Sequence, residues 1–246
     1  MDIQGRAAII TGTRRIGGVI AAELAARGAA VTVVYNRSRG EALRAVDTIA
    51  SAGGRAIAVN ADVSVPEACR RIVSRTIKAF GRLDILVNMA SLYQARPFDE
   101  LTPDDLDRHL AVDLRGTYLC SLAAVPAMRR GGGGRIINFA DWLPIGHRPR
   151  YKGYLAYYVA KAGVIALTEA MALELAGDNI LVNAIAPGPI LAPPDLDEEE
   201  VKAVEHATPV GRWGGAGEIA KAVISLAETD FITGETIRVD GGRHLK

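Results

Sequence analysis

Two side chains that can exchange a proton lie one helical turn apart near the middle of the chain. Tyr157 and Lys161 are four residues apart in the apolar, alanine-rich run Tyr154–Leu175, and residues at that spacing share one face of a helix. A free phenol has a pKa of about 10, and an ammonium group fixed beside it favours the phenolate. The pair therefore predicts proton exchange near neutral pH. The alternative is a half-buried tyrosine beside a lysine whose charged head reaches solvent.

An acidic residue precedes this pair at the end of a predicted strand. Asp141 follows the β-rich segment Arg135–Phe139, and no serine or threonine lies between Phe139 and Tyr157. Asp141 is thus the polar group placed to act with Tyr157. A carboxylate accepts hydrogen bonds from N–H groups, but an ionised one is a poor partner for a developing oxyanion.

The elements that position these groups alternate along the chain. Strands are predicted at Ala7–Thr11, Ala30–Tyr35, Ala56–Asn60, Ile85–Val87, Arg135–Phe139, Ile180–Ala186 and Thr236–Val239. Helical patterns occur near Gly17–Arg27, Gly40–Ala52, Pro66–Phe80, Asp104–Met128, Tyr154–Ala176 and Ala216–Ala227. The alternation predicts α/β architecture with a doubly wound, seven-stranded parallel sheet and helices on both faces.

One long stretch interrupts this alternation. Residues 187–215 show no regular pattern, and loops of that length in compact domains are often lids, so we expect a substrate lid here. The acidic run Asp195–Glu200 within it is either a solvated face or the start of a helix. Otherwise the chain has no repeat and no long linker, which predicts a single domain, residues 1–246.

The turn after the first predicted strand is rich in glycine. Thr11 runs into Gly12-Thr13-Arg14-Arg15-Ile16-Gly17-Gly18, and a helix follows. Backbone N–H groups of such a turn, together with a helix N-terminus, can bind a pyrophosphate. The order of strand, turn and helix therefore predicts a dinucleotide site, and the alternative is a plain tight turn.

The end of the second predicted strand indicates which dinucleotide binds. Arg37 and Ser38 follow it, and no acidic residue is present to accept a hydrogen bond from a ribose 2′-hydroxyl. A cation at this place suits a 2′-phosphate, so we expect NADP(H), with NADPH preferred to NADH. Arg14 could add a second positive charge. The alternative for Arg37 is an ordinary surface arginine.

Composition excludes several classes of function. The chain has 246 residues, is 49% hydrophobic and carries a net charge of +1, without the basic stripe of a nucleic-acid-binding protein. No uninterrupted apolar run approaches the ~18 residues of a membrane span. Cys69 and Cys120 lie far apart in sequence and the histidines show no metal-ligand spacing, so neither a disulfide framework nor a metal is expected. We expect a cytoplasmic protein that acts on a small molecule.

Over nearly its whole length the chain resembles the short-chain dehydrogenase/reductase family. The motifs that carry the resemblance are Thr11-Gly12…Gly17, Asp62-Val63, Asn88-Met89-Ala90-Ser91, Tyr157…Lys161, Pro187-Gly188 and Asp240-Gly241-Gly242. The resemblance implies a Rossmann fold, nicotinamide-dependent hydride transfer, Tyr157 as proton donor or acceptor, and Lys161 holding the nicotinamide ribose while lowering the tyrosine pKa. It also implies a homotetramer built on the long helices after strands four and five.

The resemblance further implies a set of cofactor contacts. These are Gly12, Arg14, Arg15, Ile16, Arg37, Ser38, Asp62, Val63, Asn88, Ala90, Tyr157, Lys161, Pro187, Gly188 and Ile190.

The chain departs from the family pattern at three places. Asp141 stands near the position of the family's serine, and Asp113, in Asp113-Leu114-Arg115-Gly116, stands where the family has a catalytic asparagine. The alignment implies that Asp113 is a catalytic residue together with Asp141, Tyr157 and Lys161, and it leaves open whether Asp113 takes over the asparagine's water-positioning role. In the glycine turn, Gly17 aligns with the last motif glycine, which places Arg15 at the middle one.

At these positions the chain resembles the pteridine reductase branch of the family. In that branch the equivalents of Arg15, Ser91, Asp141 and Tyr157 line the pterin site, and an aromatic residue at the position of Tyr93 stacks on the ring. The sequence thus predicts an NADPH-dependent reductase of a pterin-like heterocycle. Two alternatives stay open: a carbonyl reductase of a 3-oxoacyl, ketone or sugar substrate, and a non-catalytic protein that senses NADP(H).

Overall fold

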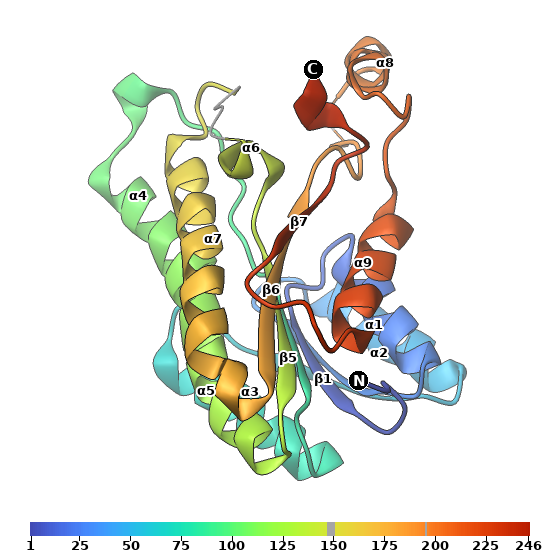
Figure 1. The fold of residues 1–246 in the computed structure, drawn as a ribbon. Helices are drawn as coiled ribbons and strands as arrows, with labels where there is room; N and C mark the ends of the chain where they lie inside the picture. Colours follow the sequence, from blue (N-terminus) through green and yellow to red (C-terminus); the bar gives the residue numbers. More distant parts are fainter. Residues whose placement is uncertain (147–150, 195) are drawn as a thin grey trace.

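A single parallel sheet organises the computed structural model, which describes residues 1–146, 151–194 and 196–246 (Figure 1). In the described chain the strand order is β3-β2-β1-β4-β5-β6-β7. The strands are β1 (Ala7–Thr11), β2 (Ala30–Tyr35), β3 (Arg55–Asn60), β4 (Ile85–Asn88), β5 (Gly134–Phe139), β6 (Ile180–Pro187) and β7 (Thr236–Val239). Neighbouring strands are parallel throughout. The seven-stranded parallel sheet predicted from sequence is confirmed.

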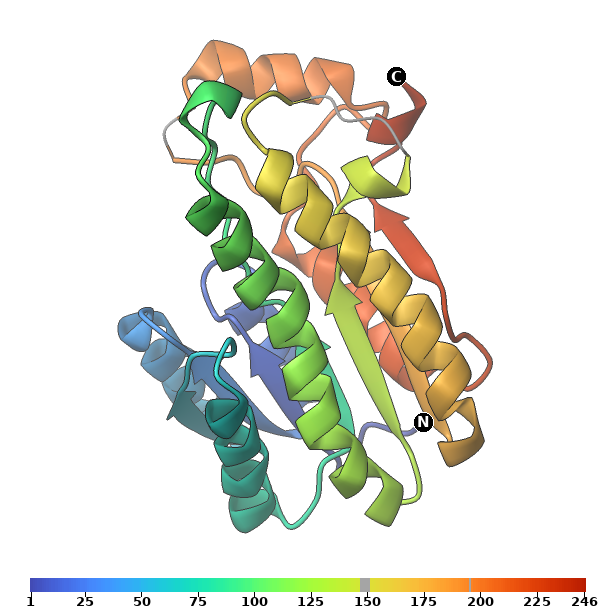
Figure 2. The same cartoon turned by 90° about the vertical axis from the view of Figure 1, so that its left-hand side faces the viewer.

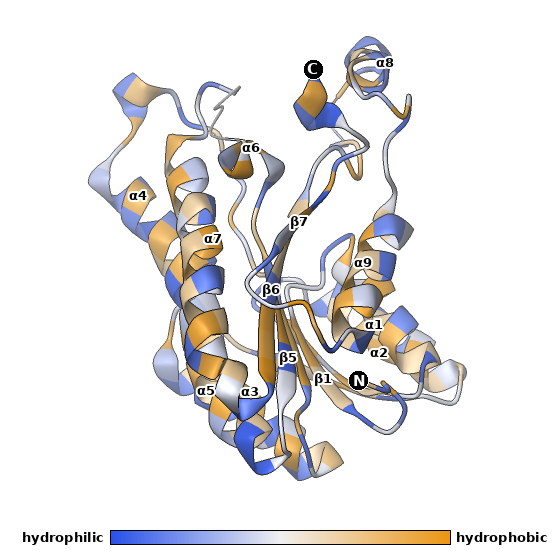
Figure 3. Ribbon diagram, in the orientation of Figure 1, coloured by the Kyte–Doolittle hydropathy of each residue, from blue (hydrophilic) through white to orange (hydrophobic). Residues whose placement is uncertain are grey.

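Helices cover both faces of the sheet, as the strand composition requires. Strands β1, β4 and β5 are buried along their whole length, which is typical of parallel sheets with two covered faces. Helices α1 (Gly17–Ala26), α2 (Arg39–Ser51) and α9 (Ala216–Glu228) pack on one face. Helices α3 (Pro66–Phe80), α5 (Gly116–Arg130) and α7 (Leu155–Leu175) pack on the other. Figure 3 shows the apolar strands between these two layers.

The chain direction across the sheet reverses between two central strands. β1 pairs with β2 on one side and with β4 on the other, so that Thr11 lies opposite both Val34 and Asn88. In doubly wound sheets, ligands bind beyond the carboxyl ends of the strands at such a switch point. The glycine turn after β1 and the segment after β4 therefore open onto the same edge.

The helical segment predicted at Asp104–Met128 is interrupted. It consists of α4 (Pro103–His109), a π-helical segment η2 (Leu110–Arg115) and α5. A π-helical turn adds a residue to the helical repeat and is often found at functional sites, and here it contains Asp113. Figure 2 shows this segment running beside α7.

Two short helices lie at the edge where the strands end. Helix α6 (Trp142–Ile145), which was not predicted, begins directly after Asp141. Helix α8 (Glu198–Ala207) lies within the stretch expected to be irregular, and Asp197 caps it by accepting a hydrogen bond from the Glu200 N–H. The acidic run thus starts a helix, because its carboxylates satisfy free N–H groups of the first turn. No helix in the described part of the chain is long and apolar enough to cross a membrane.

The two cysteines are closer than their sequence separation indicates. Cys69 on α3 and Cys120 on α5 are buried free thiols with a Sγ–Sγ distance of 3.4 Å. They meet because α3 and α5 pack against each other on the same face of the sheet. Their separation of 51 residues along the chain does not predict this contact.

Candidate active site

Asp141 and Tyr157 form a direct hydrogen bond at the carboxyl edge of the sheet. The Tyr157 hydroxyl donates to Asp141 Oδ2 at 3.0 Å. The other carboxylate oxygen, Oδ1, accepts a hydrogen bond from the Leu143 N–H at 2.9 Å and so caps α6. The short helix therefore holds the carboxylate in place while α7 presents the phenol to it. The pairing expected from sequence is present, although sixteen residues separate the two groups.

Lys161 lies one turn after Tyr157 on α7, but its ammonium group contacts Phe139 and Asp113 instead of the Tyr157 hydroxyl. Its Nζ donates to the Phe139 carbonyl oxygen at 2.8 Å and lies 3.4 Å from Asp113 Oδ1. Nζ is 5.7 Å from the centre of the Tyr157 ring. The side chains of Lys161 and Asp113 are 3% and 0% exposed, so the two charges are paired away from solvent, as buried charges must be.

Asp113 accepts from several further donors. Its carboxylate receives hydrogen bonds from the Ser91 hydroxyl and, at 3.3 Å, from the Leu92 N–H. Its Oδ2 lies 3.3 Å from Nδ1 of His109, one turn earlier and also buried. A buried carboxylate needs such partners to offset lost hydration. His109 was not predicted as a site residue. Its spacing of four residues from Asp113 places both side chains on one helical face and could have indicated the contact.

The surroundings of Tyr157 hold its phenol in the neutral form. Burial raises the pKa of Tyr157 well above its ordinary value, and the nearby carboxylates of Asp141 and Asp113 raise it further. Burial also raises the pKa of the Asp141 carboxyl. The lowered tyrosine pKa expected from Lys161 is not found, because the Lys161 ammonium is bound to Phe139 and Asp113 while a carboxylate contacts the phenol.

Two further tyrosine rings, Tyr93 and Tyr154, pack next to Tyr157. The Tyr93 ring stacks on the Tyr154 ring, with centroids 4.7 Å apart, and meets the edge of Tyr157 at 5.0 Å. Tyr93 remains 60% exposed. It can therefore cover a flat ring bound beside Tyr157, in the arrangement that aromatic pairs prefer.

The glycine turn after β1 is packed too closely to accept side chains at Gly12 and Gly17. A Cβ atom on Gly17 would lie 2.2 Å from the Gly12 carbonyl oxygen, and one on Gly12 would lie 3.0 Å from Ala90 Cα. Helix α1 begins at Gly17 without a side-chain cap, so N–H groups of its first turn are free to bind an anion. Ile16 occupies the cap position. The residues present thus fit a nicotinamide dinucleotide.

The residues predicted to bind the adenosine end of the cofactor include two arginines, Arg14 and Arg37. Arg37 and Arg14 are exposed, Ser38 is half-buried, and no ion pair within the described residues engages either arginine. Asp62 accepts hydrogen bonds from the Ser64 N–H and hydroxyl at 2.9 and 2.6 Å. These bonds, chiefly the one from the hydroxyl, lower the Asp62 pKa. The arginines are therefore available to a 2′-phosphate, and the Asp62 carboxylate is fixed in place.

Arg15 makes a different contact from the one expected. Its backbone is left-handed, with φ of 62°, and Nη2 donates to the carbonyl oxygens of Leu191 and Ala192 at 2.8 and 2.7 Å. It therefore ties the glycine turn to the stretch after β6. In the described residues it makes no hydrogen bond to Asp141 or Tyr157.

Other residues predicted to contact the cofactor lie at the ends of strands, Asn88 as the last residue of β4 and Pro187 as the last residue of β6. The Asn88 amide is turned inward, donating to Asn138 Oδ1 and Ser121 Oγ at 3.0 Å each, so its side chain holds β4 to its neighbours. Gly188 follows Pro187, the last residue of β6, and packs so closely on Asp240 that a Cβ atom would lie 2.5 Å from Asp240 Cβ. The remaining predicted positions near this edge are Val63, Ala90 and Ile190, of which Val63 and Ile190 are buried.

The described residues contain no group of three or more histidine, cysteine, aspartate or glutamate side chains that could hold a metal ion.

Comparison with known proteins extends over almost the whole chain. Residues 10–244 match the family model described as enoyl-(acyl carrier protein) reductase. The (2S)-[(R)-hydroxy(phenyl)methyl]succinyl-CoA dehydrogenase subunit BbsD of Thauera aromatica is 38% identical over 251 residues, covering 100% of this chain and 99% of that protein. The short-chain reductase protein NovJ of Streptomyces niveus is 38% identical over 253 residues, covering 98% and 94%.

Two further similarities agree with these. The 3-oxoacyl-[acyl-carrier-protein] reductase FabG of Staphylococcus aureus is 34% identical, covering 98% of each chain. The solved structure of a short-chain dehydrogenase/reductase from Serratia marcescens superposes with a TM-score of 0.91 at 34% identity, covering 99% of this chain and 100% of that one. The chain belongs to the short-chain dehydrogenase/reductase family and is an NAD(P)-dependent oxidoreductase of that type.

Proposed function

We propose that the protein is an NADPH-dependent reductase of a flat, conjugated heterocycle of the pterin type, with Asp141, Tyr157 and Lys161 at its active site. The observation that carries the proposal is the Asp141 carboxylate, which lies 3.0 Å from the Tyr157 hydroxyl near the family's serine position. The exposed ring of Tyr93 stands 5.0 Å from Tyr157 and supplies the stacking surface. A carboxylate beside an aromatic face matches a planar ring that carries adjacent N–H donors.

The residues have separate tasks in this proposal. The bound cofactor supplies the hydride, and its pyrophosphate fits the turn from Gly12 to Gly17 while Arg37 and Arg14 attract a 2′-phosphate. Lys161 holds the nicotinamide ribose, and Asp113 keeps the lysine head in position from 3.4 Å.

The protonation states favour the reductive direction at the active site. The raised pKa of Tyr157 keeps a proton on the phenol across the physiological range, so Tyr157 can donate it to the reduced substrate. Asp141, when ionised, accepts hydrogen bonds from substrate N–H groups. Its present bonds from the Tyr157 hydroxyl and the Leu143 N–H hold the carboxylate ready for this role.

Reduction of a 3-oxoacyl thioester or a simple ketone is the second candidate. Two relatives favour it: one is named as a dehydrogenase of a substituted succinyl-CoA and the other as a 3-oxoacyl-carrier-protein reductase. The raised pKa of Asp141 supports it as well, because a neutral carboxylic acid can donate to a carbonyl oxygen as the family's serine does.

Two structural features belong to the same proposal. Residues 187–215 form a lid over the substrate, fastened to the glycine turn by the two hydrogen bonds from Arg15. The chain assembles as a homotetramer through α5 and α7. In support, large apolar side chains on these helices are exposed, among them Leu122 at 55% and Leu173 at 83%, as expected of a surface covered by another copy.

A screen of NADPH oxidation tests the proposal. The substrates are dihydrobiopterin, dihydrofolate, quinones and 3-oxoacyl thioesters, and NADPH binding is measured separately by fluorescence. We expect turnover that is fastest with a dihydropterin. Turnover confined to 3-oxoacyl thioesters would select the second candidate. Tight NADPH binding without turnover on any substrate would instead identify a cofactor-sensing protein.

A further inference from the structure

Cys69 and Cys120, the two cysteines of the chain, form a thiol pair where helices α3 and α5 pack together. Their sulfur atoms lie 3.4 Å apart, and the two residues are only 1% and 4% exposed. The Cys69 thiol donates to the Val63 carbonyl oxygen at 3.3 Å, so the Cys120 thiol is the donor in the contact between the sulfur atoms. The two thiols therefore form a hydrogen-bonded series that ends at the backbone of Val63.

The two thiols differ in reactivity because each has a different place in this series. The hydrogen bond from Cys120 lowers the pKa of Cys69, whereas the same bond and then burial raise the pKa of Cys120. The thiolate is the nucleophile in cysteine oxidation, so Cys69 reacts first and Cys120 is in contact with the sulfur that has been oxidised. Because both thiols are buried, the oxidant must be as small as hydrogen peroxide and must enter through local openings of the helix layer.

We propose that Cys69 and Cys120 are a modification site at which hydrogen peroxide forms a reversible disulfide that weakens binding of the nicotinamide cofactor. In the first step the sulfur of Cys69 attacks one peroxide oxygen: a sulfur–oxygen bond forms, the oxygen–oxygen bond breaks, and water leaves a sulfenic acid behind. In the second step the sulfur of Cys120 attacks the sulfenic sulfur, the disulfide bond forms, and a second water leaves. The two thiols give up two electrons and two protons, and the peroxide takes them up as it is reduced to water.

Val63 connects the thiol pair to the cofactor, because it is one of the residues predicted to contact the dinucleotide. A Cβ atom on Gly116 would lie 2.8 Å from Val63 Cγ2, so the first turn of α5 already packs tightly on this side chain. Gly116 and Cys120 are four residues apart and share that face of α5. A disulfide shortens the distance between the sulfur atoms from 3.4 Å to about 2 Å. It therefore draws α5 against Val63 and removes the hydrogen bond from Cys69 to the Val63 carbonyl oxygen.

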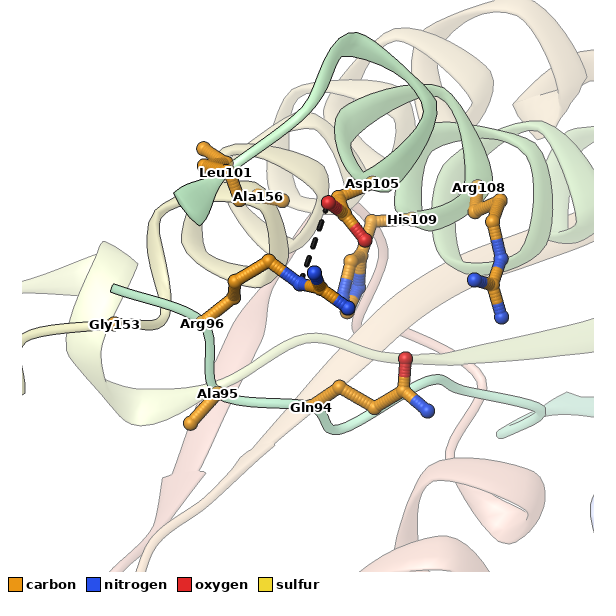
Figure 4. Close-up of a pocket in the computed structure, with 9 residues that line it drawn as sticks. All are labelled: Gln94, Ala95, Arg96, Leu101, Asp105, Arg108, His109, Gly153 and Ala156. Atoms are coloured by element: carbon orange, nitrogen blue, oxygen red, sulfur yellow. Dashed lines mark ion pairs between the residues drawn. The ribbon is translucent and has the colours of Figure 1, made fainter. Parts of the chain in front are cut away.

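The other end of the same helical run carries a polar pocket that the disulfide should leave unchanged. The pocket has a volume of about 430 Å³ and lies between the segment that follows Tyr93, helix α4 and the start of α7 (Figure 4). His109, which lines it, precedes Cys120 by about three helical turns. We therefore expect oxidation to act on cofactor affinity through Val63 and to leave the KM of a substrate unchanged. The inference goes beyond the proposed function, since it requires a bound dinucleotide but no particular substrate.

Treatment of the parent protein with hydrogen peroxide tests the proposal. Peptide mapping without reduction should show Cys69 and Cys120 in one linked pair, whose mass is two hydrogen atoms below the sum of the reduced peptides. The Kd of the dinucleotide that the parent binds more tightly, NADPH or NADH, should rise about threefold to tenfold, as for one lost hydrogen bond. Dithiothreitol should restore the parent Kd. This reversal separates the disulfide from methionine oxidation, because a thiol reductant leaves methionine sulfoxide in place.

Two variants serve as matched controls. Cys69→Ser keeps a hydroxyl that can donate to the Val63 carbonyl oxygen but has no sulfur, so its Kd should equal that of the parent and should not respond to peroxide. Cys120→Ala removes the second thiol, so dimedone should label the sulfenic acid of Cys69 and no linked peptide should form. Thermal unfolding verifies that both variants are folded, and the measurements on the parent decide the matter if either is not.

Three results would overturn the proposal. The first is a parent protein without a linked peptide at a peroxide concentration that oxidises its methionines. The second is a linked peptide with an unchanged Kd, and the third is an equal loss of affinity in peroxide-treated Cys69→Ser. A parent that forms the disulfide and loses cofactor affinity supports the proposal even if it reduces no substrate of the panel, so the failure of the proposed function is a separate result.

Discussion

Substitution of Asp141 separates the two candidate substrate classes. The carboxylate now accepts two hydrogen bonds, from the Tyr157 hydroxyl at 3.0 Å and the Leu143 N–H at 2.9 Å. Asp141→Asn keeps the shape, but its amide has one acceptor oxygen, which the Leu143 N–H occupies, and it turns an N–H donor toward the substrate. A hydrogen bond to a charged group contributes ~1.5–3 kcal/mol to the free energy of binding. The kcat/KM for a dihydropterin should therefore fall roughly tenfold to 150-fold.

Asp141→Ser should act in the opposite direction. It removes the buried carboxylate and supplies a hydroxyl donor, so kcat/KM for a simple ketone should increase relative to the parent. Serine and asparagine both accept well from a helix N-terminus, so α6 should persist in both variants. Thermal unfolding and NADPH affinity serve as controls and should change little.

The assay is NADPH oxidation by the parent and both variants, with one dihydropterin and one ketone. A general loss of stability would lower both activities together and could not produce the expected crossover. If Asp141→Asn leaves the reduction of every substrate unchanged, Asp141 does not contact the substrate and the heterocycle proposal is wrong.

Three further predictions concern the cofactor, the lid and pH. Arg37→Asp should reverse the preference for NADPH over NADH, which we expect to be about tenfold to a hundredfold in the parent; equal affinities of the parent for both cofactors, measured by fluorescence titration, would refute this. Arg15→Gln should weaken the bonds to Leu191 and Ala192 at 2.8 and 2.7 Å, so that limited proteolysis cuts residues 187–215 faster; an unchanged cleavage rate would argue against a fastened lid. Because burial raises the Asp141 pKa, acidification should protonate it earlier than an ordinary aspartate. The rate of dihydropterin reduction should then fall at acid pH, whereas the rate of ketone reduction should not. In Asp141→Asn the pH–rate profiles of the two substrates should no longer differ in this way.

The fold could be predicted from sequence because its determinants are local. Runs such as Ala30–Tyr35 are short, β-branched and buried on both faces, and they agree with the observed strand. Close packing of backbone at Gly12 and Gly17 leaves no room for a side chain, so the turn was recognisable from its residue types alone. The Tyr157–Lys161 spacing likewise follows from the helical repeat.

The site's electrostatics could not be predicted, because they depend on contacts between distant segments. The π-helical turn of η2 adds a residue that a helical pattern does not reveal, and it places Asp113 beside Lys161. Sequence spacing alone gave Tyr157 a cationic neighbour, whereas the folded chain sets the Asp141 carboxylate against its hydroxyl. Burial, and then the carboxylates of Asp141 and Asp113, therefore raise the pKa of Tyr157, whereas the sequence predicted a lowered pKa.

The most direct test of the account is NADPH oxidation by Tyr157→Phe under single-turnover conditions. The substitution removes the proton donor but little volume. With the best substrate of the panel, we predict a rate at least ~10²-fold below the parent and unchanged NADPH binding. Lys161→Ala should in addition weaken NADPH binding. A Tyr157→Phe protein that reduces the substrate at close to the parent rate would contradict the account.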